Sequence, residues 1–210
     1  MENEEVAKED EEKFEDEEKL EEGDWIVHKQ HGVGRVEAIE AKSIGGEETK
    51  YFRVKVSSGV YWLPIAKAPD YIRAVSTRYR IRMVLKSIRD LPKDLPDNYK
   101  ARNQYVEDKL AGAEIQLKGE LLRDLHARGP NEDVNLTVID GRQLDMLREQ
   151  FLREMMVVLD IDMDKAEEKL DKALKKSVDQ MKENKKDEKK EEKEKKEELE
   201  AFDDDDFFED

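Results

Sequence analysis

The chain has 210 residues, of which 45% are charged and 37% are hydrophobic, so it can hold one or two small domains and part of it cannot join a core. The absence of cysteine excludes disulfides, thiolate zinc sites and cysteine nucleophiles, and it is typical of a reducing compartment. No N-terminal apolar segment resembles a signal peptide, and no run approaches the roughly 18 apolar residues of a membrane span. The sequence therefore predicts a cytoplasmic protein without a membrane segment.

The net charge of −16 is spread unevenly along the chain. Residues 1–22 carry a net charge of −10 and residues 179–210 carry −8, whereas residues 23–178 carry +2. Charged blocks with few apolar residues are typical of disordered tails. We therefore expect an acidic disordered tail at each end, and the acidity of the whole chain does not exclude nucleic acid as a partner of the middle.

Residues 23–75 have the pattern of a small β-module. Tight turns at Gly45-Gly46 and Gly59 separate short apolar or alternating segments, and Pro64 suggests an edge strand or a strand end. Five short strands within roughly 50 residues predict a small antiparallel barrel-like sheet. The predicted strands lie near 25–28, 33–41, 51–56, 60–64 and 71–73.

From residue 76 the apolar spacing becomes helical, which predicts a compact all-α domain over 76–178. Asp97 or Asn98 can cap the second helix and Asp164 the fifth, and the apolar stripe fades beyond Val178 into a Lys/Glu tract. The predicted fold class is α+β with a charged segment at 179–210. The predicted helices lie near 81–88, 98–110, 115–125, 144–158 and 164–174.

Four motifs in this order resemble those of the CarD-like transcription regulators, the CarD/CdnL family. They are the strand–turn–strand run at 23–36, the segment N-Y-K-A-R-N-Q-Y at 98–105, the helix E-L-L-R-D-L at 120–125 and the apolar helix at 144–159. The first motif is also similar to the RNA-polymerase-interacting domain of transcription-repair coupling factor. The chain has no motor ATPase motifs, so the CarD-like resemblance is preferred.

The resemblance implies a non-catalytic transcription regulator. Its Tudor-like β-module would dock on the β subunit of bacterial-type RNA polymerase, partly through a sheet edge. Its helical domain would then sit at the upstream edge of the promoter bubble, wedge an aromatic side chain into the minor groove and stabilise the open complex. DNA contact is expected to be weak and independent of base identity, and a cytoplasmic, nucleoid-associated monomer is expected.

The resemblance also assigns site residues. Tyr99 stands where the family usually has a wedging tryptophan, and Arg102 matches a family arginine, whereas Ala101 and Gln104 stand where many members are basic. The expected DNA-binding residues are Tyr99, Lys100, Arg102, Arg89 and Lys93. The expected polymerase-binding residues are Lys42, Ile44, Arg53 and Trp62.

Several alternatives remain open at this stage. The basic stretch 73–102 holds nine bases and three acids, and it is either a DNA or polymerase contact or the solvated face of a helix. Tyr99 is either the wedge or a staple that packs on Leu95. The protein as a whole is either the factor described above or an adaptor that binds polymerase and has lost its DNA contact.

Other candidate sites are weaker. The spacing of His28 and His31 favours hydrogen bonding within the turn over metal binding. The sequence also contains no recognisable set of a nucleophile, a general base and a residue that orients the base, so we expect no metal, no cofactor and no enzymatic activity. The acidic-aromatic tip at 202–208 is a solubilising tail, a DNA mimic that covers the basic 73–102 face, or a docking segment for another protein.

Overall fold

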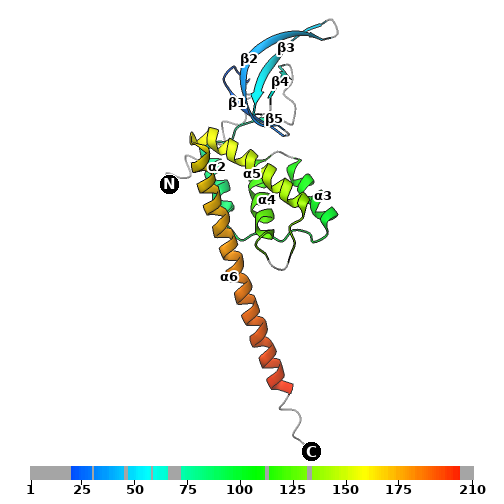
Figure 1. Ribbon diagram of the computed structural model, residues 1–210, viewed down its shortest axis with the longest axis vertical. Coiled ribbons are helices and arrows are strands. Elements are labelled where there is room, and N and C mark those ends of the chain that lie inside the picture. The colour runs from blue at the N-terminus through cyan, green and yellow to red at the C-terminus, as the bar shows by residue number, and fades with distance from the viewer. Residues whose placement is uncertain are drawn as a thin grey trace, which may run out of the picture.

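The computed structural model describes residues 20–203 apart from 30, 45–46, 58, 66–71, 112–113 and 132–133. Figure 1 shows a β-module at one end of the molecule, a helical domain beside it and one long helix that projects away from both. The expected tail residues 1–19 and 204–210 lie outside the described residues. This order of a β-module followed by helices confirms the predicted α+β class.

The β-module is one antiparallel sheet of five strands in the order β4-β3-β2-β1-β5. Among the described residues β4 and β5 pair with one neighbour each, so the sheet is curved but not closed into the predicted barrel. Its alternating apolar side chains bury a small core around Ile26, Val36, Phe52, Val54 and Leu63. The strands are β1 (Trp25–His28), β2 (Gly32–Ile44), β3 (Glu47–Val56), β4 (Gly59–Pro64) and β5 (Ile72–Ala74).

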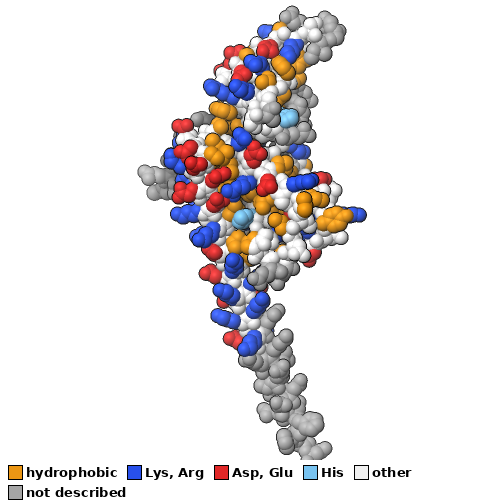
Figure 2. Space-filling view, viewed as in Figure 1, with side chains coloured by type: hydrophobic (Ala, Val, Ile, Leu, Met, Phe, Trp, Pro, Cys, Tyr) orange, Lys and Arg blue, Asp and Glu red, His pale blue; other side chains and the backbone are white. Residues whose placement is uncertain are grey.

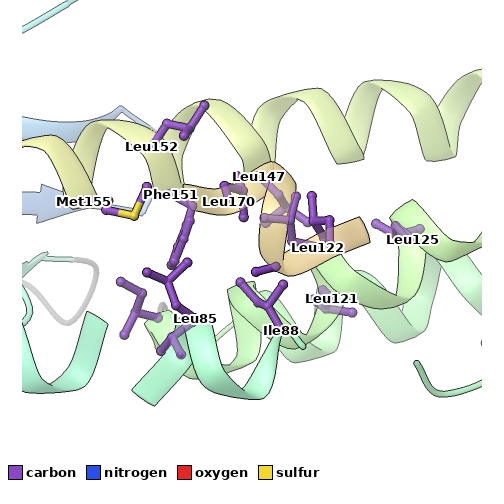
Figure 3. Close-up of a cluster of buried hydrophobic side chains, with 14 of the residues drawn as sticks. Leu85, Ile88, Leu121, Leu122, Leu125, Leu147, Phe151, Leu152, Met155 and Leu170 are labelled. Atoms are coloured by element: carbon purple, nitrogen blue, oxygen red, sulfur yellow. The ribbon is translucent and has the colours of Figure 1, made fainter. Parts of the chain in front are cut away.

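Five helices follow and enclose the larger core. Leu85 and Ile88 of the first helix meet Leu122 and Phe151 from later ones, and Figure 3 shows how these side chains point into one space. Of the two predicted caps, Asp97 and Asn98, it is Asn98 that caps its helix, by accepting the backbone N–H groups of residues 100 and 101. The helices are α2 (Arg78–Ser87), α3 (Tyr99–Leu110), α4 (Ile115–Arg128), α5 (Val138–Leu159) and α6 (Met163–Asp203).

Two helix starts differ from the sequence prediction. Helix α5 begins at Val138 instead of residue 144, because Thr137 and Asp140 form a reciprocal capping box. The apolar residues of its first turn, Val138 and Ile139, are exposed, so they add nothing to the apolar stripe from which the start was judged. Helix α6 is capped by Asp162, which accepts the backbone N–H of Lys165, and not by Asp164.

The segment expected to become a tail at residue 179 continues as helix α6 to Asp203. Its packing does change near the expected place, because Val178 and Met181 are the last buried apolar residues of the helix among the side chains that the structure describes. The Lys and Glu residues beyond them have high helix propensity and frequently stand four residues apart with opposite charge. The helix therefore continues without a core to support it.

One buried carboxylate helps to join the β-module to the helical domain, beside contacts between β2 and α5. Glu154 of α5 accepts two hydrogen bonds of 2.7 Å from the Arg73 guanidinium and two more from the backbone and hydroxyl of Ser76. Burial alone would raise the pKa of Glu154, but the bonds from Arg73 and Ser76 outweigh it and hold this pKa below its ordinary value. The carboxylate thus ties the segment after β5 to the helical domain.

Candidate functional site

The outward face of β2, β3 and β4 gathers three of the four residues expected to bind polymerase. Arg53 of β3 stands directly opposite Trp62 of β4 in the sheet register. Trp62 is 43% exposed, its indole N–H donates to Glu40 at 2.8 Å, and the Lys42 ammonium lies 3.1 Å from the centroid of its ring. The indole is therefore held in a fixed orientation while much of it faces solvent.

Charges surround this indole in an ordered pattern. A bulge between Val36 and Ala38 places Glu37 as the extra residue of β2, and Glu37 pairs with both Arg53 and Lys55. Arg53 also lies 3.7 Å from Glu40. The exposed tryptophan thus sits among partly neutralised charges, which is the composition of a protein-binding surface.

The fourth expected residue lies at the far end of the same hairpin. Ile44 is the last residue of β2 and pairs with Glu47, and its side chain is outside the described part of the chain. The β2–β3 pair extends well beyond β1, as Figure 1 shows. Lys42 and Ile44 therefore lie on the projecting part of the sheet.

A second surface is built where α3 begins. Asn98 caps this helix, and the next residue, Tyr99, is 53% exposed with the Lys100 ammonium 6.0 Å from the centroid of its ring. The exposure disfavours the alternative in which Tyr99 packs as a staple, since Leu95 is buried without covering it. An exposed aromatic residue and a base thus stand together at a helix N-terminus, whose partial positive charge attracts anions.

Arg102 does not belong to this exposed surface, which corrects the sequence expectation. Only 1% of the residue is exposed, and its guanidinium donates to both carboxylate oxygens of Asp140 at 2.8 and 2.9 Å. The same group donates to the carbonyl oxygens of Pro96 and Asp97. Four of the five N–H donors of this guanidinium are thus used inside the protein, and the residue is buried, so Arg102 is not available to a phosphate and instead fixes the loop before Tyr99.

The Arg102–Asp140 pair also brings in residues that the sequence analysis missed. Asp140 lies in the first turn of α5, where Val138 and Ile139 are 73% and 45% exposed. Burial opposes ionisation of Asp140, yet the bonds from Arg102 and Thr137 prevail and lower its pKa. The pattern T-x-x-D at 137–140 is a capping signal that would have revealed this turn. Figure 2 shows exposed hydrophobic side chains over the α3 end of the domain.

Arg89 and Lys93 lie apart from Tyr99 and Lys100. Arg89 lines a groove between α2 and α6, and Figure 1 places α3 on the other side of α4 and α5 from these two helices. Lys93 is exposed, but it borders a hollow that also holds Asp94, Asp97 and Asp124. The dense basic run 73–102 is thus divided among separate environments, and Arg73 is already bound to Glu154.

The two histidines of the β1–β2 turn have a local structural role, as expected. The Nδ1 atom of His28 accepts the backbone N–H of His31, and the two rings lie 4.4 Å apart. Burial and the neighbouring His31 lower the pKa of His28. Within the described ranges no cluster of three His, Cys, Asp or Glu residues could hold a metal ion, and no helix there is long and apolar enough to cross a membrane.

Comparison with known proteins agrees with this division into two surfaces. Residues 20–76 match the family model of the CarD-like/TRCF RID domain, and residues 83–171 match that of the CarD C-terminal domain. The chain belongs to the CarD-like transcription factors. It is also 28% identical over 139 residues to the "Putative transcription factor YdeB" of Bacillus subtilis (strain 168), which covers 65% of this chain and 90% of that protein.

Membership places each surface in a functional region of a CarD-like protein. The face with Trp62 lies in the RID match, which implies interaction with RNA polymerase. The turn with Tyr99 lies in the C-terminal match. The chain is therefore a transcription regulator of the CarD-like type, and such regulators are generally non-catalytic.

Proposed function

We propose that this protein binds the β subunit of RNA polymerase through the β2–β4 face and stabilises the open promoter complex by placing Tyr99 at the upstream edge of the bubble. The observation that carries the proposal is the presentation of Tyr99. It is half exposed as the first residue of a capped helix, next to Lys100, and Arg102 holds the loop that precedes it. Because the backbone at Tyr99 is already ordered, inserting its ring between base steps costs little backbone entropy.

Phosphate contact on this surface comes from a small number of groups. Lys100 and the N-terminal turns of α3 and α5 supply positive charge, while Arg102 is used internally. DNA affinity in the absence of polymerase is therefore expected to be low. Discrimination would come from the unstacked geometry at the bubble edge and not from base identity.

The test is the lifetime of the open complex on a promoter with the cognate polymerase. We expect the wild-type protein to lengthen this lifetime and Tyr99→Ala to abolish the effect while polymerase binding is kept. Tyr79→Ala is the matched control, because Tyr79 is another exposed tyrosine in the first turn of a helix. Equal lifetimes with wild type and Tyr99→Ala would reject the wedge.

Polymerase binding is tested on the other surface. Trp62→Ala should weaken capture of the purified β subunit by roughly 10-fold or more, since exposed tryptophans are frequent hot spots of interfaces. Trp25→Ala is the control, because Trp25 is 39% exposed and lies three strands away on β1. Equal losses in both variants would place the β-subunit contact elsewhere.

A second candidate function is an adaptor that binds polymerase without touching DNA. Two observations favour it: Arg102 is buried, and Gln104 donates to Asp108 of its own helix in place of a base that could reach a phosphate. The adaptor predicts that Tyr99→Ala leaves promoter opening unchanged. The lifetime measurement therefore separates the two functions.

A further inference from the structure

A groove of about 760 Å³ runs between α2 and α6, on the side of the helical domain away from α3. Its floor is apolar, and its other lining residues are all basic. Figure 2 shows Lys and Arg side chains gathered over α6. The floor consists of Leu85, Leu159 and Ile161, and the basic residues are Arg78, Arg82, Arg89, Lys169, Lys172 and Lys176.

The basic residues come from one face of each helix. Positions 78 and 82 on α2 and positions 169, 172 and 176 on α6 repeat at helical spacing, and Arg89 follows the C-cap of α2, so basic residues line both sides of the apolar floor. Within the described part of the chain none of the six forms an ion pair. Six like charges in one groove repel one another, and an anionic occupant would relieve that repulsion.

Two acidic segments of this chain lie outside the described residues, and chain length distinguishes them. Helix α6 carries Asp203 27 residues past Lys176, which is about 40 Å along its axis. Residues 204–210 span at most about 25 Å even when fully extended. The C-terminal acidic tip therefore cannot return to the groove while α6 is intact, which excludes the DNA-mimic hypothesis for this face within one molecule.

The N-terminal arm starts close to the groove. Leu20 lines a hollow together with residues 72–75, and Arg78 follows only three residues later, within about 10 Å. Residues 1–19 reach about 60 Å when extended, whereas the groove along α2 is about 16 Å long. The arm holds eleven acidic and three basic residues, a net charge of −8, and it includes Val6 and Phe14 for an apolar floor.

We propose that the acidic arm 1–19 docks in the basic groove between α2 and α6 of the same molecule. Its carboxylates would meet the two basic rows, and its apolar residues would cover Leu85 and Ile161. In this state the groove is closed to other polyanions, so bulk DNA would not be bound there. The inference concerns the free protein and does not depend on the role of Tyr99.

The lack of cysteine allows a direct test in the full chain. A nitroxide attached to Glu12→Cys is the single spin label, and paramagnetic broadening of amide signals reports which residues lie near it. We expect broadening along 78–89 and 165–176 but not along α3. Lys169→Gln, Lys172→Gln and Lys176→Gln together should abolish it, as should about 1 M NaCl, which shortens the Debye length to about 3 Å.

The matched control removes the same charge from the same helix outside the groove. Lys175→Gln, Lys182→Gln and Lys186→Gln, all exposed and none lining the groove, should leave the broadening intact. Equal loss in both triple variants would overturn the proposal, because it would show general attraction to α6. Spin-labelled protein can also be mixed with isotope-enriched protein that carries no spin label. If broadening occurred only in such mixtures, it would overturn the proposal, because the arm in the groove would then come from a second copy of the chain. If the wild-type chain showed no broadening and the triple variant at 169, 172 and 176 bound duplex DNA more weakly than wild type, the groove would be identified as a DNA-binding surface instead.

Discussion

At the scale of single residues, Arg102 shows how one motif position can serve the fold instead of the ligand. Its charge satisfies Asp140 and two backbone carbonyls, so the residue orders the loop before α3. A sequence shows the arginine but not the acid 38 positions later that binds it. Of the residues that the resemblance assigns to DNA, Tyr99 and Lys100 remain exposed, and Arg102 supports the loop that precedes them.

Removal of this guanidinium should destabilise the protein strongly. Arg102→Ala leaves Asp140 as a buried carboxylate without its partner, and the free energy of unfolding in urea should fall by about 3–5 kcal/mol. Arg142→Ala, which removes an exposed arginine two residues after Asp140, should change it by less than about 0.5 kcal/mol. A small and equal effect of both substitutions would contradict the assigned role.

Lys118 should make stability depend on pH in the alkaline range. Burial and the nearby Arg73 lower the pKa of this lysine from 10.5 to about 8, and its ammonium donates to Gln150. Between pH 8 and 10.5 the folded protein loses this proton while the unfolded chain keeps it, so this group raises the free energy of unfolding as pH increases. Between a pH below 8 and a pH above 10.5, the contribution of Lys118 to the free energy of unfolding changes by about 3 kcal/mol.

The measurement is urea unfolding at several pH values from 7 to 10, in wild type and in Lys118→Met. Other lysines and tyrosines titrate in both proteins, so the difference between the two curves isolates Lys118. We expect Lys118→Met to be more stable than wild type near pH 7, where Lys118 of the wild type is buried and charged. This difference in stability should shrink toward pH 10, where Lys118 becomes neutral. Parallel curves would show that Lys118 titrates normally.

At the scale of elements, α2 and α4 approach closely at one glycine. A Cβ on Gly119 would overlap the Cγ1 atom of Val84, which is fully buried. Gly119→Ala should therefore cost about 1–3 kcal/mol of stability, even though alanine favours the helix by about 1 kcal/mol. Val84→Ala removes the Cγ1 atom that a Cβ at position 119 would overlap. The free energy of unfolding of the double variant should therefore fall by less than the sum of the decreases in the two single variants. Strict additivity in thermal or urea unfolding would contradict this packing.

The elements also show what a sequence can and cannot reveal. Local signals limited the cap of α3 to Asp97 or Asn98 and predicted the alternation of β3, because each depends on neighbouring residues. The early start of α5 was missed because the apolar residues of its first turn are exposed, although Thr137 and Asp140 encode it. The convergence of Lys42, Arg53 and Trp62 depends on strand register and a bulge at Glu37, which no local pattern specifies.

At the scale of the whole molecule, the proposed function requires two surfaces held at a fixed separation. The sheet proposed to bind polymerase and the turn with Tyr99 lie in different domains, and Glu154 forms a buried link between these domains. If the protein contacts polymerase and DNA at the same time, weakening the contact at Glu154 would leave each surface able to bind its own partner. The open complex would nevertheless no longer be stabilised, because the two surfaces would not be held in a fixed relative position. The link can therefore be tested separately from either surface.

Glu154→Gln should reduce the free energy of unfolding by about 3 kcal/mol, since it leaves the Arg73 charge without its carboxylate. Glu149→Gln is the control on the same helix, because the Glu149–Arg153 pair is exposed and worth less than about 1 kcal/mol. At a temperature where both variants remain folded, Glu154→Gln should shorten the open-complex lifetime while its affinity for the isolated β subunit stays at the wild-type value. An open-complex lifetime equal to that of wild type, in a variant whose two domains are no longer held together by Glu154, would show that the two surfaces act independently. A protein that contacts polymerase with one domain and DNA with the other can stabilise the complex only if the two domains keep a fixed relative position.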